Sequence, residues 1–244
     1  MSERITDRIE IVNADCYTLL DAWPSDAALI TDPPYGIAFA HGGGGGCLAR
    51  STRFAGAAIQ GDDRPFDPAP FLRFARVCLW GANNFASRLP DSRCWLVWDK
   101  RDGVCSNDQA DCEMAWTNLD RVARLKRHLW NGMLKASERG DERLHPMQKP
   151  VALLAWCLDV CGVTDGLVID PFMGSGSLGV ACHRAGLRYL GVEIDPEHYA
   201  TARERLTRET AQWLLMPNNS LSGPEPAAGS GYAEGTGSPG GLRK

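Results

Sequence analysis

The sequence of 244 residues contains no apolar run near the length of about 20 residues that a helix needs to cross a bilayer. Its first ten residues, MSERITDRIE, are charged and lack the apolar stretch of a secretory signal. We therefore expect no membrane partner and a cytoplasmic location. Since 44% of the residues are apolar, the chain can still bury a full core.

The sequence also lacks the cysteine spacing of a disulfide framework or a zinc finger. Its nine cysteines are scattered, which is typical of a reducing compartment. Cys157 and Cys161 stand four residues apart on an expected helix, but no second pair of ligands follows at the required spacing. We expect ordinary core thiols and no metal site.

An overall excess of positive charge is absent too, because the formal net charge is −4. Local charge differs: between residues 121 and 149 there are eight lysines and arginines and three acids. Such a run is either a solvated face or a patch that contacts phosphates. Charge alone leaves both interpretations open.

The order of elements predicts one α/β domain over residues 1–215, without an internal repeat. Residues 216–244 are rich in Gly, Pro, Ser and Ala and predict a disordered tail. Apolar and alternating segments predict a largely parallel sheet with helices between its strands. The seven expected strands are 9–15, 27–32, 76–83, 94–100, 112–117, 166–170 and 188–194, and the expected helices are 68–75, 149–161, 176–186 and 196–214.

The stretch TDPPYGIAFAHGGGGG, residues 31–46, follows the apolar end of an expected strand. Two consecutive prolines cannot continue a sheet ladder, because neither has an N–H to donate. Asp32 and Tyr35 are therefore expected in a stiff turn at the sheet edge. The glycine run 42–46 has little conformational preference and suggests a loop that closes over a ligand, or a plain flexible linker.

A second motif, GLVIDPFMGSGSLGVACHRAGLRYLGVEIDPEHYATARERL, spans residues 166–206. A strand ends at Asp170, a turn contains Gly174 and Gly176, a helix follows, and the next strand ends at Glu193. Such a turn lets a ligand approach the backbone, and a terminal acid suits ribose hydroxyls. There is no third glycine at the dinucleotide spacing and no G-K-[ST], so a sulfonium nucleoside fits better than NAD or ATP.

Three motifs in this order, DPPY (32–35), HPMQKP (145–150) and DPFMGSG (170–176), resemble the β-class amino-methyltransferases of DNA. These enzymes methylate adenine N6 or cytosine N4 and use S-adenosylmethionine. The resemblance implies a Rossmann-like, circularly permuted fold with a seven-stranded mixed sheet, one antiparallel strand and helices on both faces. The cofactor is then expected along the carboxyl ends of the strands.

The resemblance also implies roles for particular residues. Glu193 would hold the ribose hydroxyls, Asp15 would lie near the adenine, and Lys149 would lie beside the cofactor. Met147 replaces the threonine usual in the HPMQKP motif. The expected cofactor turn consists of Asp170, Pro171, Phe172, Gly174, Ser175 and Gly176.

The expected catalytic residues are Asp32, Pro33, Pro34 and Tyr35. An exocyclic amine is a poor nucleophile because its lone pair is delocalised into the ring. The Asp32 side chain and the Pro33 carbonyl are suitable acceptors for its N–H groups, and the prolines fix their geometry. Tyr35 can stack on a base that has left the duplex. No cysteine nucleophile is needed, which disfavours C5-cytosine chemistry.

The resemblance places the target-recognition region at residues 118–144 and so favours phosphate contacts for the basic run. The expected DNA contacts are Arg121, Arg124, Lys126, Arg127 and Lys135. The loops 36–67 and 101–111 are further candidates, while Trp130 is expected in the core. Double-stranded DNA is the expected partner; a second copy of the chain and a partner restriction endonuclease are further candidates.

Several functions stay open at this point. The leading hypothesis is adenine N6 methylation, since D-P-P-Y is commoner on the adenine side of the family, and cytosine N4 methylation is second. Methylation of RNA or of protein glutamine is disfavoured by the motif order. An inactive nucleoside-binding module is disfavoured because residues 32–35 are intact.

Overall fold

The computed structural model describes residues 2–37, 60–103, 110–131, 134–139, 144 and 148–215. Within them, nine strands form one mixed sheet in the order β1-β2-β11-β10-β3-β4-β6-β5-β7, and β8 pairs with β9 separately. The glycine run 42–46, Met147 and the expected tail 216–244 lie outside the described residues, as do parts of the loops 36–67 and 101–111.

The regular elements follow the expected order. The strands are β1 (Ser2–Arg4), β2 (Ile9–Asn13), β3 (Ala28–Thr31), β4 (Arg76–Trp80), β5 (Trp95–Asp99), β6 (Cys112–Thr117), β7 (Arg124–Arg127), β8 (Trp130–Asn131), β9 (Leu134–Lys135), β10 (Leu167–Asp170) and β11 (Arg188–Glu193). The α-helices are α1 (Val151–Val160), α2 (Ser177–Arg184) and α3 (Pro196–Leu214).

The predicted fold class is confirmed, but the sheet is larger than expected. All seven predicted strands are present, and β1 and β7 extend the sheet at its two edges. Both additions are short and charged, which is common for edge strands because charge discourages pairing with another chain. Two strands, β1 and β6, run antiparallel to the other seven, where one was expected.

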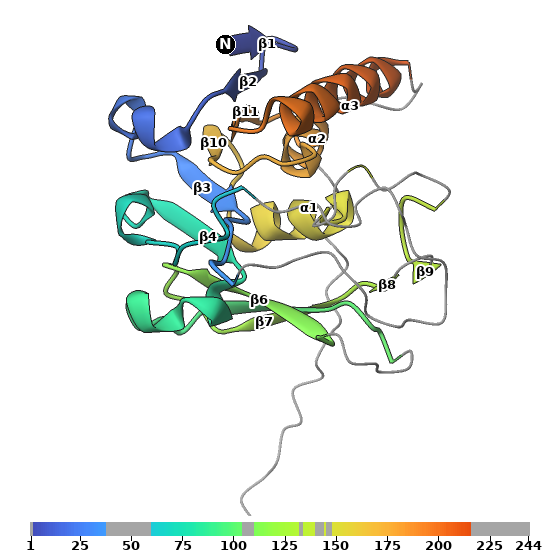
Figure 1. Ribbon diagram of the computed structural model, residues 1–244. Coiled ribbons are helices and arrows are strands. Elements are labelled where there is room, and N and C mark those ends of the chain that lie inside the picture. The colour runs from blue at the N-terminus through green and yellow to red at the C-terminus, as the bar shows by residue number, and fades with distance from the viewer. Residues whose placement is uncertain are drawn as a thin grey trace, which may run out of the picture.

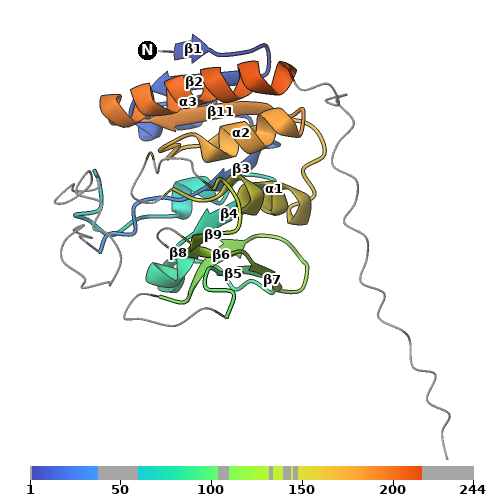
Figure 2. The ribbon, with the colours of Figure 1, turned by 90° about the vertical axis from the view of Figure 1, so that its right-hand side faces the viewer.

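The three α-helices cover one face of the sheet, and short helical turns cover the other (Figures 1 and 2). Leu153, Leu178 and Leu206 bring α1, α2 and α3 into the core on the first face. On the opposite face, Phe71 and Phe85 belong to an aromatic-rich cluster. The described part of the chain holds no helix that combines the length and the apolar character needed to span a membrane.

The expected helix 68–75 is wrong. The structure has only a single 3-10 turn, η4 (Ala69–Phe71), before β4 begins at Arg76. Pro68 and Pro70 lack N–H groups and leave too few donors for a regular helix in this short segment. Phe71 is nevertheless fully buried, so the segment still contributes to the core.

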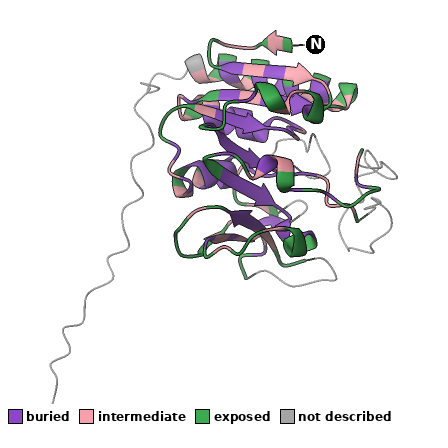
Figure 3. Cartoon of the chain, turned by 90° about the vertical axis from the view of Figure 1, so that its left-hand side faces the viewer, coloured by how far each residue is buried: buried purple, intermediate pink, exposed green. Residues whose placement is uncertain are grey.

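The central strands are buried on both faces, as their continuous apolar sequences require (Figure 3). Along the chain, β3 leads to β4 on one side and β10 leads to β11 on the other, so the connections diverge between β3 and β10. Ligands bind beyond the carboxyl ends of the strands at such a switch point. Asp32 and Asp170 stand at these two adjacent ends.

Candidate functional site

A cleft of about 840 Å³ lies along the carboxyl edge of the sheet. Its wall includes all four residues predicted to be catalytic and eight of the nine predicted to bind the cofactor. These residues are Asp32, Pro33, Pro34, Tyr35, Asp15, Asp170, Pro171, Phe172, Gly174, Ser175, Glu193 and Lys149. The sheet therefore brings the DPPY motif and the cofactor turn, which are more than 130 residues apart in sequence, into one site.

The DPPY turn has its geometry fixed from several sides. The Tyr35 hydroxyl donates a hydrogen bond to Asp32 Oδ1 at 2.6 Å. The Tyr35 ring lies against Gly81, where an added Cβ would come within 1.8 Å of the ring. Gly81 also has a φ of +68°, so glycine is required there for both reasons.

The chain leaving the motif is held by Asp62, which is itself buried. Asp62 Oδ1 accepts hydrogen bonds from the backbone N–H groups of Gly36, at 2.7 Å, and Ile37, at 3.3 Å. Charged acceptors of this kind form stronger hydrogen bonds than neutral ones. The described end of the 36–67 loop thus fixes the exit of the DPPY turn.

Lys149 contacts Asp32, the acid predicted to be catalytic, and is not confined to the predicted cofactor side of the cleft. Its ammonium group forms a short ion pair with Asp32 Oδ2. It also lies 3.2 Å from Glu113 Oε2, while Lys100 Nζ lies 3.2 Å from Glu113 Oε1. The Lys149 nitrogen lies 5.4 Å from the centre of the Trp80 ring, which contributes a cation–π contact.

These contacts shift the pKa values of the cluster in different directions. Burial raises the pKa of Asp32, although Lys149 opposes the shift. Burial also disfavours the charge of Glu113, but Lys149 and Lys100 outweigh it and lower the pKa of Glu113. For Lys149, the two carboxylates outweigh burial and raise the pKa. Lys149 is therefore a fixed cation at neutral pH.

Asp170, at the end of β10, is turned into the protein. Its carboxyl accepts hydrogen bonds from Thr31 Oγ1 at 2.6 Å and from the Tyr189 hydroxyl at 3.2 Å. Burial raises its pKa to about 7, even though these hydrogen bonds favour the charged form. Asp170 thus fixes the start of the cofactor turn and is readily neutralised.

Glu193, at the end of β11, holds the turn from the other side. Its Oε2 accepts from the Gly174 N–H at 2.8 Å, and its Oε1 accepts from the Asp195 N–H at 3.0 Å. Each carboxylate oxygen has a second lone pair, so the group still has acceptor capacity for ribose hydroxyls. Burial raises the pKa of Glu193.

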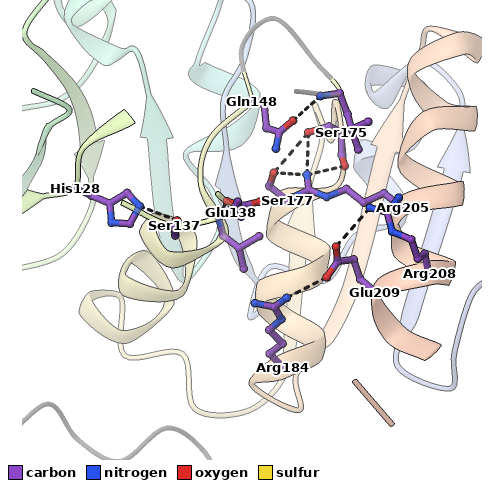
Figure 4. A network of polar contacts seen from close by, with 12 residues as sticks. His128, Ser137, Glu138, Gln148, Ser175, Ser177, Arg184, Arg205, Arg208 and Glu209 are labelled. Carbon is purple, nitrogen blue, oxygen red and sulfur yellow. Dashed lines mark hydrogen bonds and ion pairs between the residues drawn. The ribbon is translucent and has the colours of Figure 1, made fainter. Parts of the chain in front are cut away.

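A buried arginine on α3 supports the same turn from behind (Figure 4). Arg205 Nη1 donates to the Ser175 carbonyl oxygen and Oγ, both at 3.2 Å, and to Ser177 Oγ at 2.7 Å. Its Nη2 lies 2.8 Å from Glu138 Oε1. Glu138 Oε2 in turn accepts from the Val151 N–H, at the start of α1. Arg205 therefore links the cofactor turn to the region predicted to recognise the target.

Two predicted cofactor residues have specific structural roles. Asp15 caps the 3-10 turn η1 (Cys16–Thr18), with its side chain accepting from the Tyr17 N–H, and stays exposed at the cleft. Gly176 does not line the cleft. A Cβ on Gly176 would lie 3.2 Å from Leu206 of α3, so this glycine permits close packing of α2 against α3.

None of the five predicted DNA contacts lines the cleft. Arg121 lies at the opposite, amino edge of the sheet, where it donates to the Val160 carbonyl at the end of α1. Arg124 and Arg127 are exposed on β7, and Lys126 is half-buried there. Lys135 lies over the Trp130 ring at 4.8 Å. Trp130 itself is buried, as predicted.

Sequence reasoning missed Lys100, Glu113, Asp62 and Arg205. The first two follow β5 and begin β6, and the only signal was their place beside strand ends that face the cleft. Arg205 looks like a solvated residue in the charged helix sequence ARERL. Its burial follows only from how α3 packs on α2.

Comparison with known proteins is informative at the level of the family. The family model described as DNA methylase matches residues 92–204, which contain HPMQKP and DPFMGSG but not DPPY. Type II methyltransferase M2.DpnII of Streptococcus pneumoniae is 35% identical over 81 residues, which are 33% of this chain and 30% of the relative. Type II methyltransferase M2.LlaDCHI of Lactococcus lactis subsp. cremoris is 32% identical over 114 residues, which are 46% of this chain and 41% of the relative. The match thus covers less than half the length of these relatives.

Two solved structures share the fold. The M1.HpyAVI–SAM complex aligns with 81% of this chain and 98% of its own, with a TM-score of 0.52 and 20% identity. PvuII DNA methyltransferase, described as cytosine-N4-specific, aligns with 85% of this chain and 93% of its own, with a TM-score of 0.54 and 15% identity. At these identities the two likenesses show a shared fold, whereas the likeness to the DNA methylase family rests on the model matched over residues 92–204.

Proposed function

We propose that this protein transfers a methyl group from S-adenosylmethionine to the exocyclic N6 amine of adenine in DNA. The observation that carries the proposal is the placement of Asp32 and the cofactor turn in one cleft, at adjacent strand ends. The relatives named as Type II methyltransferases support the reaction class.

The charge of the cleft fits a cationic sulfonium nucleoside. Eight acids line the wall, against three lysines and arginines. The acids are Asp15, Asp32, Asp62, Asp63, Glu113, Asp170, Glu193 and Asp195, and the cations are Arg64, Lys100 and Lys149. Such a surface attracts a positive ligand and repels phosphate, so only a base that has left the duplex suits its interior.

Bound S-adenosylmethionine supplies an activated methyl group. Asp32 and the Pro33 carbonyl accept hydrogen bonds from the target amine and localise its lone pair, which forms the new N–C bond as the S–C pair remains on sulfur. The nitrogen then releases a proton, and Asp32 is placed to receive it because burial raises its pKa. Tyr35 keeps Asp32 oriented and presents an aromatic face to the base.

Mass analysis of nucleosides tests the target atom. Incubation of DNA with the protein and methyl-labelled S-adenosylmethionine, followed by hydrolysis, is expected to give labelled N6-methyladenine. Labelled N4-methylcytosine would replace the adenine assignment with the second candidate. The absence of label in DNA, with label in RNA or protein, would overturn the DNA substrate.

We further propose that the exposed basic side chains of β7 contact DNA phosphates outside the cleft. The acidic interior cannot neutralise the backbone, so that contribution has to come from other surfaces. A second copy of the chain and a partner endonuclease stay proposals, testable by light scattering and by co-purification.

A further inference from the structure

A continuous chain of polar contacts connects five residues from four segments at the base-binding end of the cleft. Asp32 and Tyr35 belong to the turn after β3, Lys100 follows β5, Glu113 belongs to β6, and Lys149 precedes α1. The contacts run from Tyr35 to Asp32, Lys149, Glu113 and Lys100 in that order. With both acids ionised, two negative and two positive charges alternate along it.

Glu113 is the residue on which this arrangement depends. Each of its oxygens contacts a different lysine at 3.2 Å, so it bridges Lys100 and Lys149. The Lys149 side chain is only 5% exposed, which leaves little water to solvate its ammonium group. A buried cation takes the acceptors that surround it, and here those acceptors are Asp32 and Glu113.

Asp32 has to satisfy two opposing requirements in the proposed reaction. It needs a nearby cation, because a buried carboxylate without one becomes protonated, and the neutral acid is a weaker acceptor and can take up no further proton. It also needs a free lone pair, because a cation that belonged to Asp32 alone would compete with the target amine. Sharing Lys149 with a second carboxylate satisfies both requirements.

We propose that Glu113 is a positioning residue that shares the Lys149 ammonium with Asp32 and so keeps Asp32 charged but available to the target amine. The role of Asp32 rests on the proposed function, whereas the contacts do not. Asp170 stands at the neighbouring strand end, where the charge of Asp32 helps to raise its pKa, and its carboxyl is held by Thr31 and Tyr189. Lys100 offsets the charge of Glu113.

The first test measures the titration of Asp32 directly, by carbon NMR of protein labelled at the aspartate carboxyl carbons. The Asp32→Asn variant identifies the signal. In Glu113→Gln, Lys149 pairs with Asp32 alone, and the pKa of Asp32 is expected to fall by about one unit. In Lys100→Met, Glu113 draws Lys149 away, and the pKa of Asp32 is expected to rise.

Opposite shifts in these two variants support the proposal, and a merely structural role for Glu113 predicts neither. An unchanged Asp32 titration, or shifts of the same sign, overturns it. Lys100→Met provides an independent reading if Glu113→Gln does not fold. Asp120→Asn is the matched control, because Asp120 is an exposed partner of Arg93 and its loss should leave the Asp32 signal unchanged.

The second test is kinetic and separates this proposal from the proposed function. For Glu113→Gln we expect kcat to fall about tenfold, the acidic limb of its pH profile to move to lower pH, and KM for S-adenosylmethionine to stay unchanged. Glu113→Asp, which keeps the charge, should restore part of the rate. A normal rate and profile in Glu113→Gln overturn the positioning role. If the wild type methylates no DNA, the proposed function fails. The titration of Asp32 would still test whether Glu113 shares the Lys149 ammonium with Asp32.

Discussion

The two ends of the cleft are built from different chemistry. At the predicted cofactor end, residues 170–177 and 193 are held by hydrogen bonds that involve backbone groups, hydroxyl groups and the Arg205 guanidinium. At the predicted base end, Asp32 belongs to a cluster of ion pairs that includes Lys149 and Glu113. The first arrangement presents a rigid turn, and the second adjusts the charge of one carboxylate.

The difference agrees with the role that we propose for each end. A cofactor is recognised by shape and hydrogen bonding, for which a preorganised backbone is sufficient. A reacting amine changes its charge during the reaction, so the group facing it has to accommodate that change. Substitutions at the base end should therefore affect turnover, and substitutions at the cofactor end should affect binding.

Asp32→Ala should have the largest effect. It should impair the base end of the cleft and leave the cofactor end intact. We expect turnover to fall at least about 1,000-fold, since loss of one preorganised group at a reacting centre commonly costs two to three orders of magnitude. Calorimetry should show S-adenosylmethionine affinity close to that of the wild type. Near-normal turnover in this variant would contradict the proposed mechanism.

Asp170 gives a pH test at the boundary between the two ends. Its pKa is about 7 in the folded protein and 3.8 ordinarily, so folding favours its protonated form. This contribution is fully present below about pH 4 and is lost as the pH rises through 7. Relative to Asp170→Asn, the wild type should lose up to about 4 kcal/mol of unfolding free energy across that range. Parallel pH profiles in urea denaturation would contradict this.

Arg205→Met should destabilise the support behind the cofactor turn. Removing one partner of a buried ion pair typically costs about 3 kcal/mol, and Glu138 would lose its arginine. Urea denaturation measures this loss, and S-adenosylmethionine affinity should weaken because Ser175 and Ser177 lose their donor. Arg203→Met is the control, as Arg203 pairs with Glu3 on the exposed side of the same helix. Equal losses in both variants would argue against a special role for Arg205.

Glu193→Gln should weaken cofactor binding about tenfold, or about 1.4 kcal/mol. The backbone N–H groups of Gly174 and Asp195, which donate to Glu193, would lose a charged acceptor. Turnover at saturating cofactor should change little, which is the reverse of the pattern for Asp32→Ala. A loss of kcat with unchanged affinity would show that the two ends are not separate.

Much of the difference between the two ends of the cleft could be predicted from sequence, because the DPPY and DPFMGSG motifs mark where two strands end. The seven expected strands and the three longer helices follow from apolar runs and turn chemistry, whereas the meeting of Asp32 with Asp170 follows from the fold that the family resemblance implies. Both motifs are contiguous, so local patterns were enough to find them. The cofactor end in particular depends on a single strand–turn–helix segment.

Only part of the charged cluster at the base end could be predicted from sequence, because the cluster depends on pairing between strands that are distant in sequence. Lys100 and Glu113 meet Lys149 only since β5 pairs antiparallel with β6, next to β4. No local pattern reports such a register. The strand β7 was missed for a related reason: four residues with three positive charges are typical of a solvated loop, and only the parallel pairing with β5 makes them an edge strand.

The smallest expected effect concerns Arg124, Lys126 and Arg127, which belong to neither end of the cleft. Their charges have two physical explanations, protection of a sheet edge and interaction with phosphates. If they bind DNA, replacing all three with Gln should weaken binding of every sequence alike and flatten the slope of log K against log salt by about 0.9 for each phosphate that is no longer neutralised. Arg76, Arg93 and Arg188, exposed at the amino edge of the sheet, form a control triple of equal charge. Equal slopes for the two triples would leave edge protection as the role of β7, and the DNA backbone would then have to be neutralised by another surface outside the acidic cleft.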